Sequence, residues 1–346
     1  MKVAIIAGPY IPVPPPKYGG TERIIHYLIK GLIAAGHEPI LLGPGDSKVE
    51  CEVVPIVPKG LYFPKTTKQV PAFQKLLKAA HEETEKQISK ILPRVDIIHS
   101  HDFDLLKFKD FPNITTIHGP IEFMNLDYFS KRKNLNYVSI SKNQQEGYPD
   151  LNWVGVVYNG EDPNLFPIVK RPDNYVCFVG RFDQQKNPHL AIQLAIGHDL
   201  KIKLAGKIDF QGEEYFKTEV RPYLKHPLVE YLGEIDAEST TKLLGHAKCN
   251  LHPTGFREPF GLTVLEAAYG GTPTLAIARG SMPELIQEGM TGMLVEDFVE
   301  GYHQIKESFK MNRSYIARRA RVLFNYHNMT RNYIKTYEKV LKLSSK

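Results

Sequence analysis

The sequence predicts an α/β protein built from two successive, doubly wound parallel sheets. The chain has 346 residues, which suits two domains of ordinary size. Short apolar runs alternate with amphipathic helical patterns along the chain, as in repeated β-α-β units. The alternation is interrupted by a stretch rich in proline and charge at 161–172. We therefore expect an N-terminal domain at 1–160, a linker at 161–172 and a C-terminal domain at 173–327.

The first half opens with the apolar run KVAIIA at 2–7, which is typical of a buried parallel strand. A loop rich in proline and glycine follows. Thr21 can then cap a helix whose apolar residues recur at helical spacing until Gly36. A long amphipathic helix is predicted at 72–92. Further strands are predicted at 38–43, 95–100, 114–119, 136–141 and 154–159.

The second half restarts with the strand YVCFVG at 175–180 and repeats the alternation. Its remaining strands are expected at 202–206, 229–233, 249–253, 272–276 and 292–295. Its helices are expected at 188–196, near 213–224, from 236, from 262 and at 282–287. Helices dominate from Val299 onward, and the last helix covers about 328–343.

Composition narrows the class of protein. The net charge of +6 is a mild basic excess, and no signature of a nucleic-acid-binding module is present. The three cysteines form no disulfide or zinc pattern, which fits a reducing cytoplasm. No apolar run reaches the length of a membrane span. The basic cluster near the C-terminus is interpreted as a solvated helix face, with weak docking on the inner membrane surface as the alternative: Arg313, Arg318, Arg319 and Arg321.

The segment from Pro253 to Glu288 carries the most chemical information. Glu258 lies in a loop after a predicted strand, and Gly261 to Thr263 open the following helix. The first amides of a helix are unpaired and its dipole is positive there, so this end suits a phosphate. Glu266 lies about one turn further along and can accept both hydroxyls of a ribose. Singly, each glutamate could be an exposed charge; together with the glycines, a binding site is the stronger interpretation.

Arg181 and Lys186 follow the first strand of the second half, in GRFDQQKNP. Ligands of open α/β sheets bind at the carboxyl ends of the strands. Two cations at that edge can neutralise a diphosphate leaving group. The plain alternative is a basic surface loop.

The first half offers weaker signals. Gly19 and Gly20 lie between the first strand and first helix, where glycine lets the backbone approach a ligand closely. His118 ends a predicted strand, so it is either structural or catalytic. The HSHDFD segment, with His99, His101 and Asp102, resembles metal ligands, but it lacks a fourth ligand and we expect no metal there.

These motifs resemble those of the retaining glycosyltransferases of the GT-B fold, the broad family-4 group. The segment from Glu258 to Glu266 resembles the family's E-x7-E signature. The other matching motifs follow in the family's order along nearly the whole chain: PPPKYGGTER, HSHD, THGP, VVYNGEDPNLF, GRFDQQKNP and PELIQEGMTGMLV.

The resemblance implies a role for each matching residue. Glu266 would hold the donor ribose and Glu258 hydroxyls of the donor sugar. Arg181 and Lys186 would contact the diphosphate. His118 would contact the transferred sugar. The remaining donor-binding positions would be Gly19, Gly20, Gly261, Leu262 and Thr263. It also implies that the helix at 328–346 crosses back onto the N-terminal domain, that donor and acceptor meet in a cleft between the domains, and that no metal or other cofactor is needed.

The expected reaction moves a hexose from a nucleotide-diphosphate sugar, with UDP-glucose favoured, to a hydroxyl of a small-molecule, glycan or lipid-linked acceptor. Same-face attack is favoured because no carboxylate is obviously placed as an enzymic nucleophile. The acceptor is expected on loops 12–18 and 61–74. Alternatives are a nucleotide-sugar epimerase or phosphorylase of the same fold, or a non-enzymic nucleotide-sugar-binding module. A dehydrogenase ranks last because the first strand is not followed by G-x-G-x-x-G.

Overall fold

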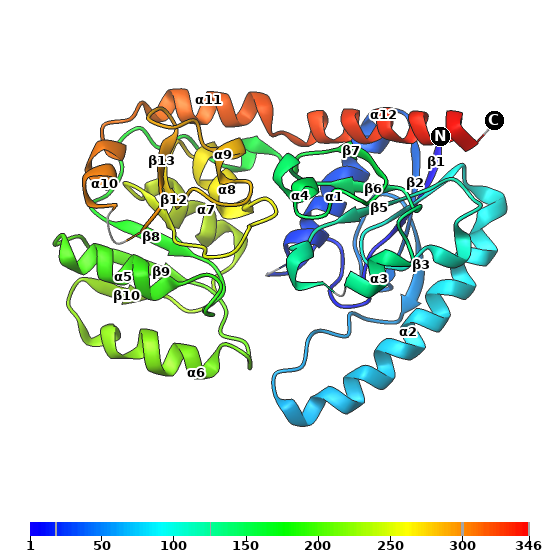
Figure 1. The fold of residues 1–346 in the computed structure, drawn as a ribbon, viewed down its shortest axis with the longest axis horizontal. Coiled ribbons are helices and arrows are strands. Elements are labelled where there is room, and N and C mark those ends of the chain that lie inside the picture. The colour runs from blue at the N-terminus through cyan, green and yellow to red at the C-terminus, as the bar shows by residue number, and fades with distance from the viewer. Residues whose placement is uncertain (18, 125, 299–300, 345–346) are drawn as a thin grey trace. The chain divides into compact units, whose positions relative to one another are not determined.

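The structure, a computed structural model, describes residues 1–17, 19–124, 126–298 and 301–344. The chain divides into two compact units. Unit 1 comprises Met1–Asp162 and Asn325–Lys346, and unit 2 comprises Pro163–Phe324. Each unit is a parallel sheet with helices, which confirms the predicted fold class (Figure 1).

Unit 1 contains a seven-stranded parallel sheet in the order β3-β2-β1-β4-β5-β6-β7. The order reverses between β1 and β4, which is the switch point where open α/β sheets bind ligands. The strands are β1 (Lys2–Ile6), β2 (Glu38–Pro44), β3 (Glu52–Val57), β4 (Ile97–Ser100), β5 (Asn113–Ile117), β6 (Tyr137–Ser139) and β7 (Trp153–Val156).

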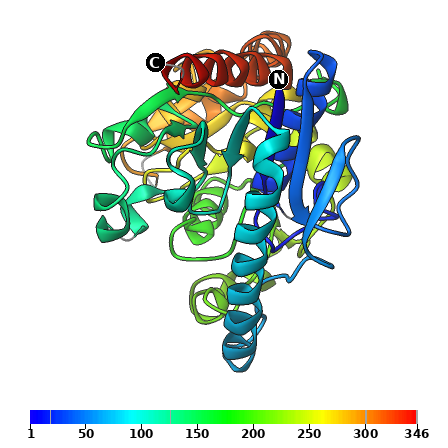
Figure 2. The ribbon, with the colours of Figure 1, turned by 90° about the vertical axis from the view of Figure 1, so that its right-hand side faces the viewer.

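Helices cover both faces of this sheet (Figures 1 and 2). They are α1 (Gly20–Ala34), α2 (Val70–Ile91), α3 (Leu126–Ser130), α4 (Lys142–Glu146) and α12 (Tyr326–Ser344). The inner stripe of α2 packs Ala80, Ile88 and Ile91 against Ile6 and Leu42 of the sheet. The apolar residues of α1 that recur at helical spacing are buried, as predicted: Ile24, Ile25, Leu28, Ile29 and Leu32.

Helix α12 completes unit 1 although it follows unit 2 in the sequence. It packs against α1, β5 and β7. Gly31 of α1 permits close contact, because a Cβ atom there would lie 2.0 Å from Thr330 Oγ1. Tyr337 is fully buried and its hydroxyl lies 2.8 Å from His99 Nδ1. The last helix predicted at 328–346 corresponds to α12, which spans Tyr326–Ser344. Residues 345 and 346 lie outside the described residues.

Unit 2 contains a six-stranded parallel sheet in the order β10-β9-β8-β11-β12-β13, which again reverses at its first strand. The strands are β8 (Val176–Val179), β9 (Ile202–Ala205), β10 (Val229–Tyr231), β11 (Asn250–His252), β12 (Thr274–Ile277) and β13 (Gly292–Val295). The helices are α5 (Pro188–Gly197), α6 (Glu213–Tyr215), α7 (Ala237–His246), α8 (Leu262–Tyr269), α9 (Met282–Leu285), α10 (Tyr302–Ser308) and α11 (Arg313–Leu323).

Alternate residues of β8 enter the two cores of unit 2, as expected for a strand buried on both faces. Val176 and Phe178 pack in the core that includes α5 and α10, and Cys177 packs in the core that includes α7 and α8. One expected helix differs from the prediction. The stretch near 213–224 is a short α-turn followed by π-helix at Phe216–Val220 and 3-10 helix at Arg221–Lys225, because Pro222 removes a backbone donor.

The stretch 161–172, which the sequence predicts as a linker, is packed structure. Glu161 pairs with Asn325 in a parallel bridge of unit 1. In unit 2, Phe166 is buried with its ring 5.0 Å from that of Tyr269. The Val169 amide donates to Gly270 O at 3.0 Å. The apolar residues hidden among the prolines and charges of this stretch explain why it packs.

Candidate active site

In unit 2, hydrogen bonds tie the loop that follows β8 to the loop that follows β11. The Gly255 amide donates to Gln185 O at 3.0 Å, and Asn187 Nδ2 donates to Pro253 O at 3.2 Å. Asn187 has a left-handed backbone (φ 49°), which asparagine tolerates better than most residues, and α5 begins just after it. The two loops therefore form one surface at the carboxyl edge of the sheet.

Across this surface, Lys186 contacts Glu258. Lys186 Nζ donates to Glu258 Oε2, and the side chains are only 16% and 13% exposed. Lys186 Nζ also lies 5.0 Å from the centre of the Phe256 ring. The structure thus brings together two residues that are 72 positions apart in the sequence and that the sequence analysis selected independently.

The surroundings of Glu258 favour its charged form. Burial alone would raise its pKa, but Lys186, His252 and Arg181 outweigh burial and hold the pKa of Glu258 below its ordinary value. His252 ends β11, with Nε2 3.8 Å from Glu258 Oε2. Burial and the charge of Lys186 lower the pKa of His252 to about 4, against the opposing effect of Glu258. At neutral pH this is a carboxylate between an ammonium group and a neutral imidazole.

Arg181 lies on the same edge, just after β8. Its Nη1 is 3.2 Å from Asp183 Oδ2 and 3.9 Å from Asp209 Oδ2, and its Nη2 donates to Gln185 Oε1 at 3.3 Å. The guanidinium is about one-third exposed. Two acidic neighbours orient it while leaving donors free toward solvent, as a phosphate-binding arginine requires.

Helix α8 begins directly after the Glu258 loop. Gly261 has φ 91°, the left-handed region that favours glycine, and a Cβ atom there would lie 2.7 Å from Met282 Cε. Leu262 and Thr263 then form the first turn, whose amides precede the helical hydrogen-bond ladder. Glu266 lies one turn further and is 2% exposed. A buried carboxylate one turn from free helix amides suits the polar end of a nucleotide.

In unit 1, Gly19 and Gly20 open α1 beside the carboxyl end of β1. A Cβ atom on Gly19 would lie 2.6 Å from Pro15 Cβ and 2.9 Å from Glu22 Oε2. Glu22 is 8% exposed, and burial raises its pKa to about 7, with Asp102 adding to the increase. Glycine is required here because a side chain has no room.

His118, at the end of β5, has a partner that the sequence did not suggest. Its Nε2 lies 2.7 Å from His101 Nδ1, and the two rings stack with centres 5.0 Å apart. Burial lowers the pKa of His118 to about 4 and holds that of His101 well below its ordinary value. Both imidazoles are therefore neutral at neutral pH, and one ring nitrogen of His118 is occupied within the protein.

The HSHD segment spreads its polar side chains. His99 is fully buried between Tyr337 OH and Thr116 Oγ1, each 2.8 Å from a ring nitrogen. Asp102 instead bonds to the Tyr10 hydroxyl, and burial raises the pKa of Asp102 to about 6. Within the described residues, no group of three or more His, Cys, Asp or Glu is arranged to hold a metal ion.

The predicted site residues therefore form two groups, one in each unit. Unit 2 gathers Arg181, Lys186 and Glu258 next to the start of α8, and unit 1 holds His118 and the Gly19–Gly20 pair. Sequence reasoning did not select His252 or Tyr10 as site residues. Position was the available signal for both, since each lies at or just after the carboxyl end of a strand.

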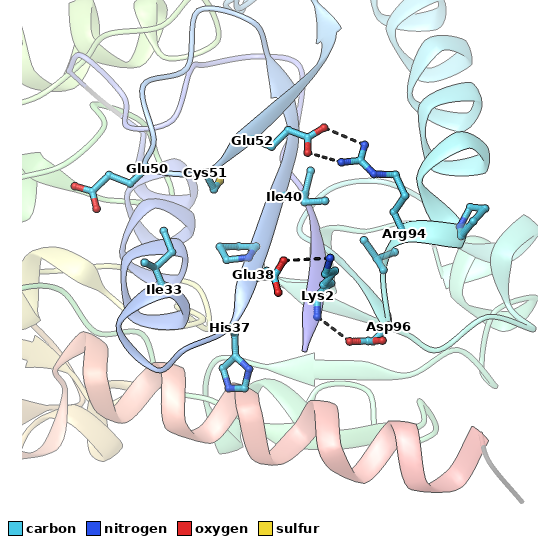
Figure 3. A pocket seen from close by; sticks show the side chains of 13 residues that line it. Lys2, Ile33, His37, Glu38, Ile40, Glu50, Cys51, Glu52, Arg94 and Asp96 are labelled. Carbon is cyan, nitrogen blue, oxygen red and sulfur yellow. Dashed lines mark hydrogen bonds and ion pairs between the residues drawn. The ribbon is translucent and has the colours of Figure 1, made fainter.

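An open cavity of about 670 Å³ lies at the opposite, amino edge of the unit 1 sheet (Figure 3). Both of its basic lysine and arginine side chains already have partners: Arg94 with Glu52, and Lys2 with Glu38 at 3.2 Å. None of the predicted site residues lines it. Ligands of parallel sheets bind at the carboxyl edge, so we assign this cavity no role in the reaction.

Two Rossmann-like units, each with a parallel sheet, are the architecture of the GT-B class of glycosyltransferases. In unit 2, cationic side chains and the N-terminus of a helix lie at the carboxyl edge of the sheet, which fits the same class. Glycosyltransferase Family 4 matches residues 18–153, and Glycosyl transferases group 1 matches residues 164–315. The chain belongs to the GT-B glycosyltransferases of the family-4 type. The chain is therefore a glycosyltransferase.

Individual relatives agree with this assignment. An uncharacterized glycosyltransferase of Methanocaldococcus jannaschii is 24% identical over 340 residues, covering 85% of each chain. The structure of sucrose-phosphate synthase from Thermosynechococcus elongatus is similar with a TM-score of 0.80 at 18% identity, covering 99% of this chain and 100% of that one. Anabaena HepE in complex with UDP-glucose has a TM-score of 0.72 at 17% identity, covering 98% and 100%. Over the described part of the chain, the helices are too short or too polar to cross a membrane.

Proposed function

We propose that this glycosyltransferase moves a glucosyl group from UDP-glucose to a hydroxyl acceptor, with retention of anomeric configuration and without a metal or other cofactor. The buried Lys186–Glu258 pair carries the proposal, because it places a cation and a hydroxyl-binding carboxylate side by side at a phosphate-suited edge. The HepE complex supports the choice of donor, since a chain of the same fold binds UDP-glucose.

Each residue of the unit 2 group then has a role in donor binding. Arg181 and Lys186 neutralise the diphosphate, and the amides of Leu262 and Thr263, following Gly261, donate to its oxygens. Glu266 accepts the ribose hydroxyls. Glu258 accepts hydroxyls of the transferred sugar, for which its lowered pKa keeps it ionised.

In unit 1, Gly19 and Gly20 let the backbone approach the phosphates, and His118 contacts the sugar with the ring edge that His101 leaves open. Neutral imidazole suits this role because it adds no charge beside the developing oxocarbenium ion. The acceptor hydroxyl attacks from the face that the diphosphate leaves, and the leaving phosphate takes its proton. Trapping of a covalent glycosyl-enzyme would contradict this step.

The acceptor belongs to the same proposal. A small molecule, a glycan or a lipid-linked sugar would meet loops 12–18 and 61–74 of unit 1, of which Tyr18 lies outside the described residues. The cysteines described are free, and two are buried, so the protein suits a reducing cytoplasm.

Donor identity is tested by thermal shift against UDP, ADP and GDP and their glucose esters. A ligand at 100 times its dissociation constant adds about 2.7 kcal/mol to stability, so the expected result is a clear rise in Tm with UDP and UDP-glucose alone. Equal shifts with all three diphosphates would reject the choice of uridine. NMR of the product's anomeric proton then decides retention against inversion.

Roles are tested with Glu266→Gln and Lys186→Met. Loss of a hydrogen bond to a charged group costs about 1.5–3 kcal/mol, so Glu266→Gln should weaken UDP binding about 10- to 100-fold. Lys186→Met should lower kcat more than donor affinity, because charge on the diphosphate grows in the transition state. Glu238→Gln, on the exposed side of α7, is the matched control and should change neither. Wild-type values for both site variants would reject the assignment.

A further inference from the structure

Residues 59–79 of unit 1, which we name the basic tip, carry several positive charges and no acidic residue. The tip contains five lysines, while the sequence has no Asp or Glu between Glu52 and Glu82. All five are exposed: Lys59, Lys65, Lys68, Lys75 and Lys78. Over the described residues none of them has an ion pair, in contrast to Lys86 further along the same helix, which pairs with Glu83 at 3.2 Å.

The same segment exposes apolar side chains. Tyr62 is 48% exposed, Phe63 49% and Leu76 53%. Phe63 stacks on Tyr10 with ring centres 4.7 Å apart, and Phe73 lies 6.2 Å from both rings. This stacking fixes one face of Phe63 and leaves the other toward solvent. A fixed cluster of exposed aromatic and leucine side chains among lysines is unusual on a surface that contacts only water.

The shape of the tip suits a flat partner. The loop before α2 and the N-terminal half of that helix extend beyond the sheet of unit 1 (Figures 1 and 2). Burial along α2 agrees with this projection, because the buried residues of the helix begin only at its middle: Ala80, Thr84, Ile88 and Ile91. Among the described residues of α2, those from Val70 to Ala79 are therefore not buried, and this part of the helix extends beyond the sheet.

We propose that the basic tip docks the enzyme on an anionic lipid surface, with its lysines at the headgroups and Phe63 and Leu76 in the interface. Basic residues combined with exposed aromatic and leucine side chains are the composition of interfacial helices. The positive charge of the tip favours anionic lipid over neutral lipid. Each lysine near an anionic surface raises the partition constant about fivefold, and the tip contains five lysines. An acidic polysaccharide would use the same charge but gains nothing from an exposed leucine such as Leu76. The tip includes the loop 61–74 that we propose for the acceptor, but docking on lipid is a separate property and does not rest on the donor site.

The test is co-sedimentation of the whole protein with vesicles of phosphatidylcholine, alone or with phosphatidylglycerol replacing part of it. We expect binding to the anionic vesicles that weakens with added salt. Lys75→Glu with Lys78→Glu should lower the partition constant at least about 25-fold, at about fivefold per lysine. Lys201→Glu with Lys225→Glu changes net charge equally at exposed lysines of unit 2 and should leave binding as it was.

Apolar insertion is tested separately with Leu76→Ser, which should weaken binding most at high salt, where the charge contribution is screened. Its control is Leu343→Ser, which changes an exposed leucine outside the tip; Leu343 is 59% exposed. An unchanged Tm for every variant shows that folding is intact. Binding to neutral vesicles as strong as to anionic ones, equal loss in the Lys201/Lys225 variant, or tight binding to dextran sulfate without binding to vesicles would each overturn the proposal.

Discussion

Replacing Lys186 with methionine would isolate the electrostatics of the unit 2 site. The substitution keeps the bulk of the side chain but leaves Glu258 without its main counter-charge, at 13% exposure. Removing one partner of a buried ion pair costs about 3–5 kcal/mol, and the partial exposure of both side chains places the cost near ~3 kcal/mol. That corresponds to about a 100-fold increase in the equilibrium constant for unfolding of unit 2.

The pH dependence of this cost follows from the sign of each pKa shift. In the wild type the pKa of Glu258 is lowered, so its ionisation contributes stability above the unfolded pKa, and that contribution is lost as pH falls through the folded value. In Lys186→Met, burial dominates and raises the pKa of Glu258, so the folded variant takes up a proton on acidification. Protonation of His252, 3.8 Å away, acts in the same direction. The difference between the two proteins should therefore be largest at neutral pH and shrink toward pH ~4.

Hydrogen exchange of the β8 and β11 amides, measured by mass spectrometry against urea, reports the stability of unit 2 without assuming that the whole chain unfolds in one step. The double variant Lys186→Met with Glu258→Gln should recover about 2 of the ~3 kcal/mol, because no buried charge remains. A difference below about 1 kcal/mol, or one that stays constant from neutral to acid pH, would refute this account of the pair.

Three further substitutions probe the packing around the sites. Arg313 is buried and donates to Ala247 O at 2.9 Å, among other acceptors, so it does not belong to the solvated helix face expected from the sequence. Arg313→Met should cost unit 2 about 3 kcal/mol in urea unfolding, and a loss under about 1 kcal/mol would contradict its structural role. Gly31→Ala should destabilise unit 1 by at least about 2 kcal/mol in thermal unfolding, since its Cβ would collide with Thr330. Tyr337→Phe leaves a ring nitrogen of His99 without its partner and should cost about 1–3 kcal/mol, while Tyr62→Phe, at an exposed position, should show no change in the same melt.

Much of the fold could be predicted from the sequence because both sheets bury their strands on both faces. The runs at 2–7 and 175–180 are continuous and apolar, and β1 and β8 lie within them. β3 at Glu52–Val57 was not anticipated: it is an edge strand that carries Pro55 and is only partly buried, so it lacks such a run. Helical periodicity alone predicted one helix near 213–224, but Pro222 interrupts it.

The candidate site was predictable only as separate strand-end segments. The rule that ligands meet carboxyl strand ends placed Lys186 and Glu258 on one edge, but their direct contact depends on hydrogen bonds between two loops that sequence spacing does not reveal. The His101–His118 pair depends likewise on the stagger of β4 against β5. Local sequence patterns predict individual helices and strands. The Lys186–Glu258 and His101–His118 contacts depend instead on how segments distant in the sequence are aligned with one another.

The position of α12 has a consequence for the order in which the protein matures. Translation releases residues 1–162 first, yet this portion lacks the helix that covers α1, β5 and β7 until residues 326–344 have also been made. Until then no helix packs against Gly31, Gly155 and the His99 side chain, which α12 contacts in the folded protein. Unit 2 is continuous in sequence and can fold in the meantime. A chain truncated before Asn325 should therefore contain a protease-resistant second unit together with a protease-sensitive first one.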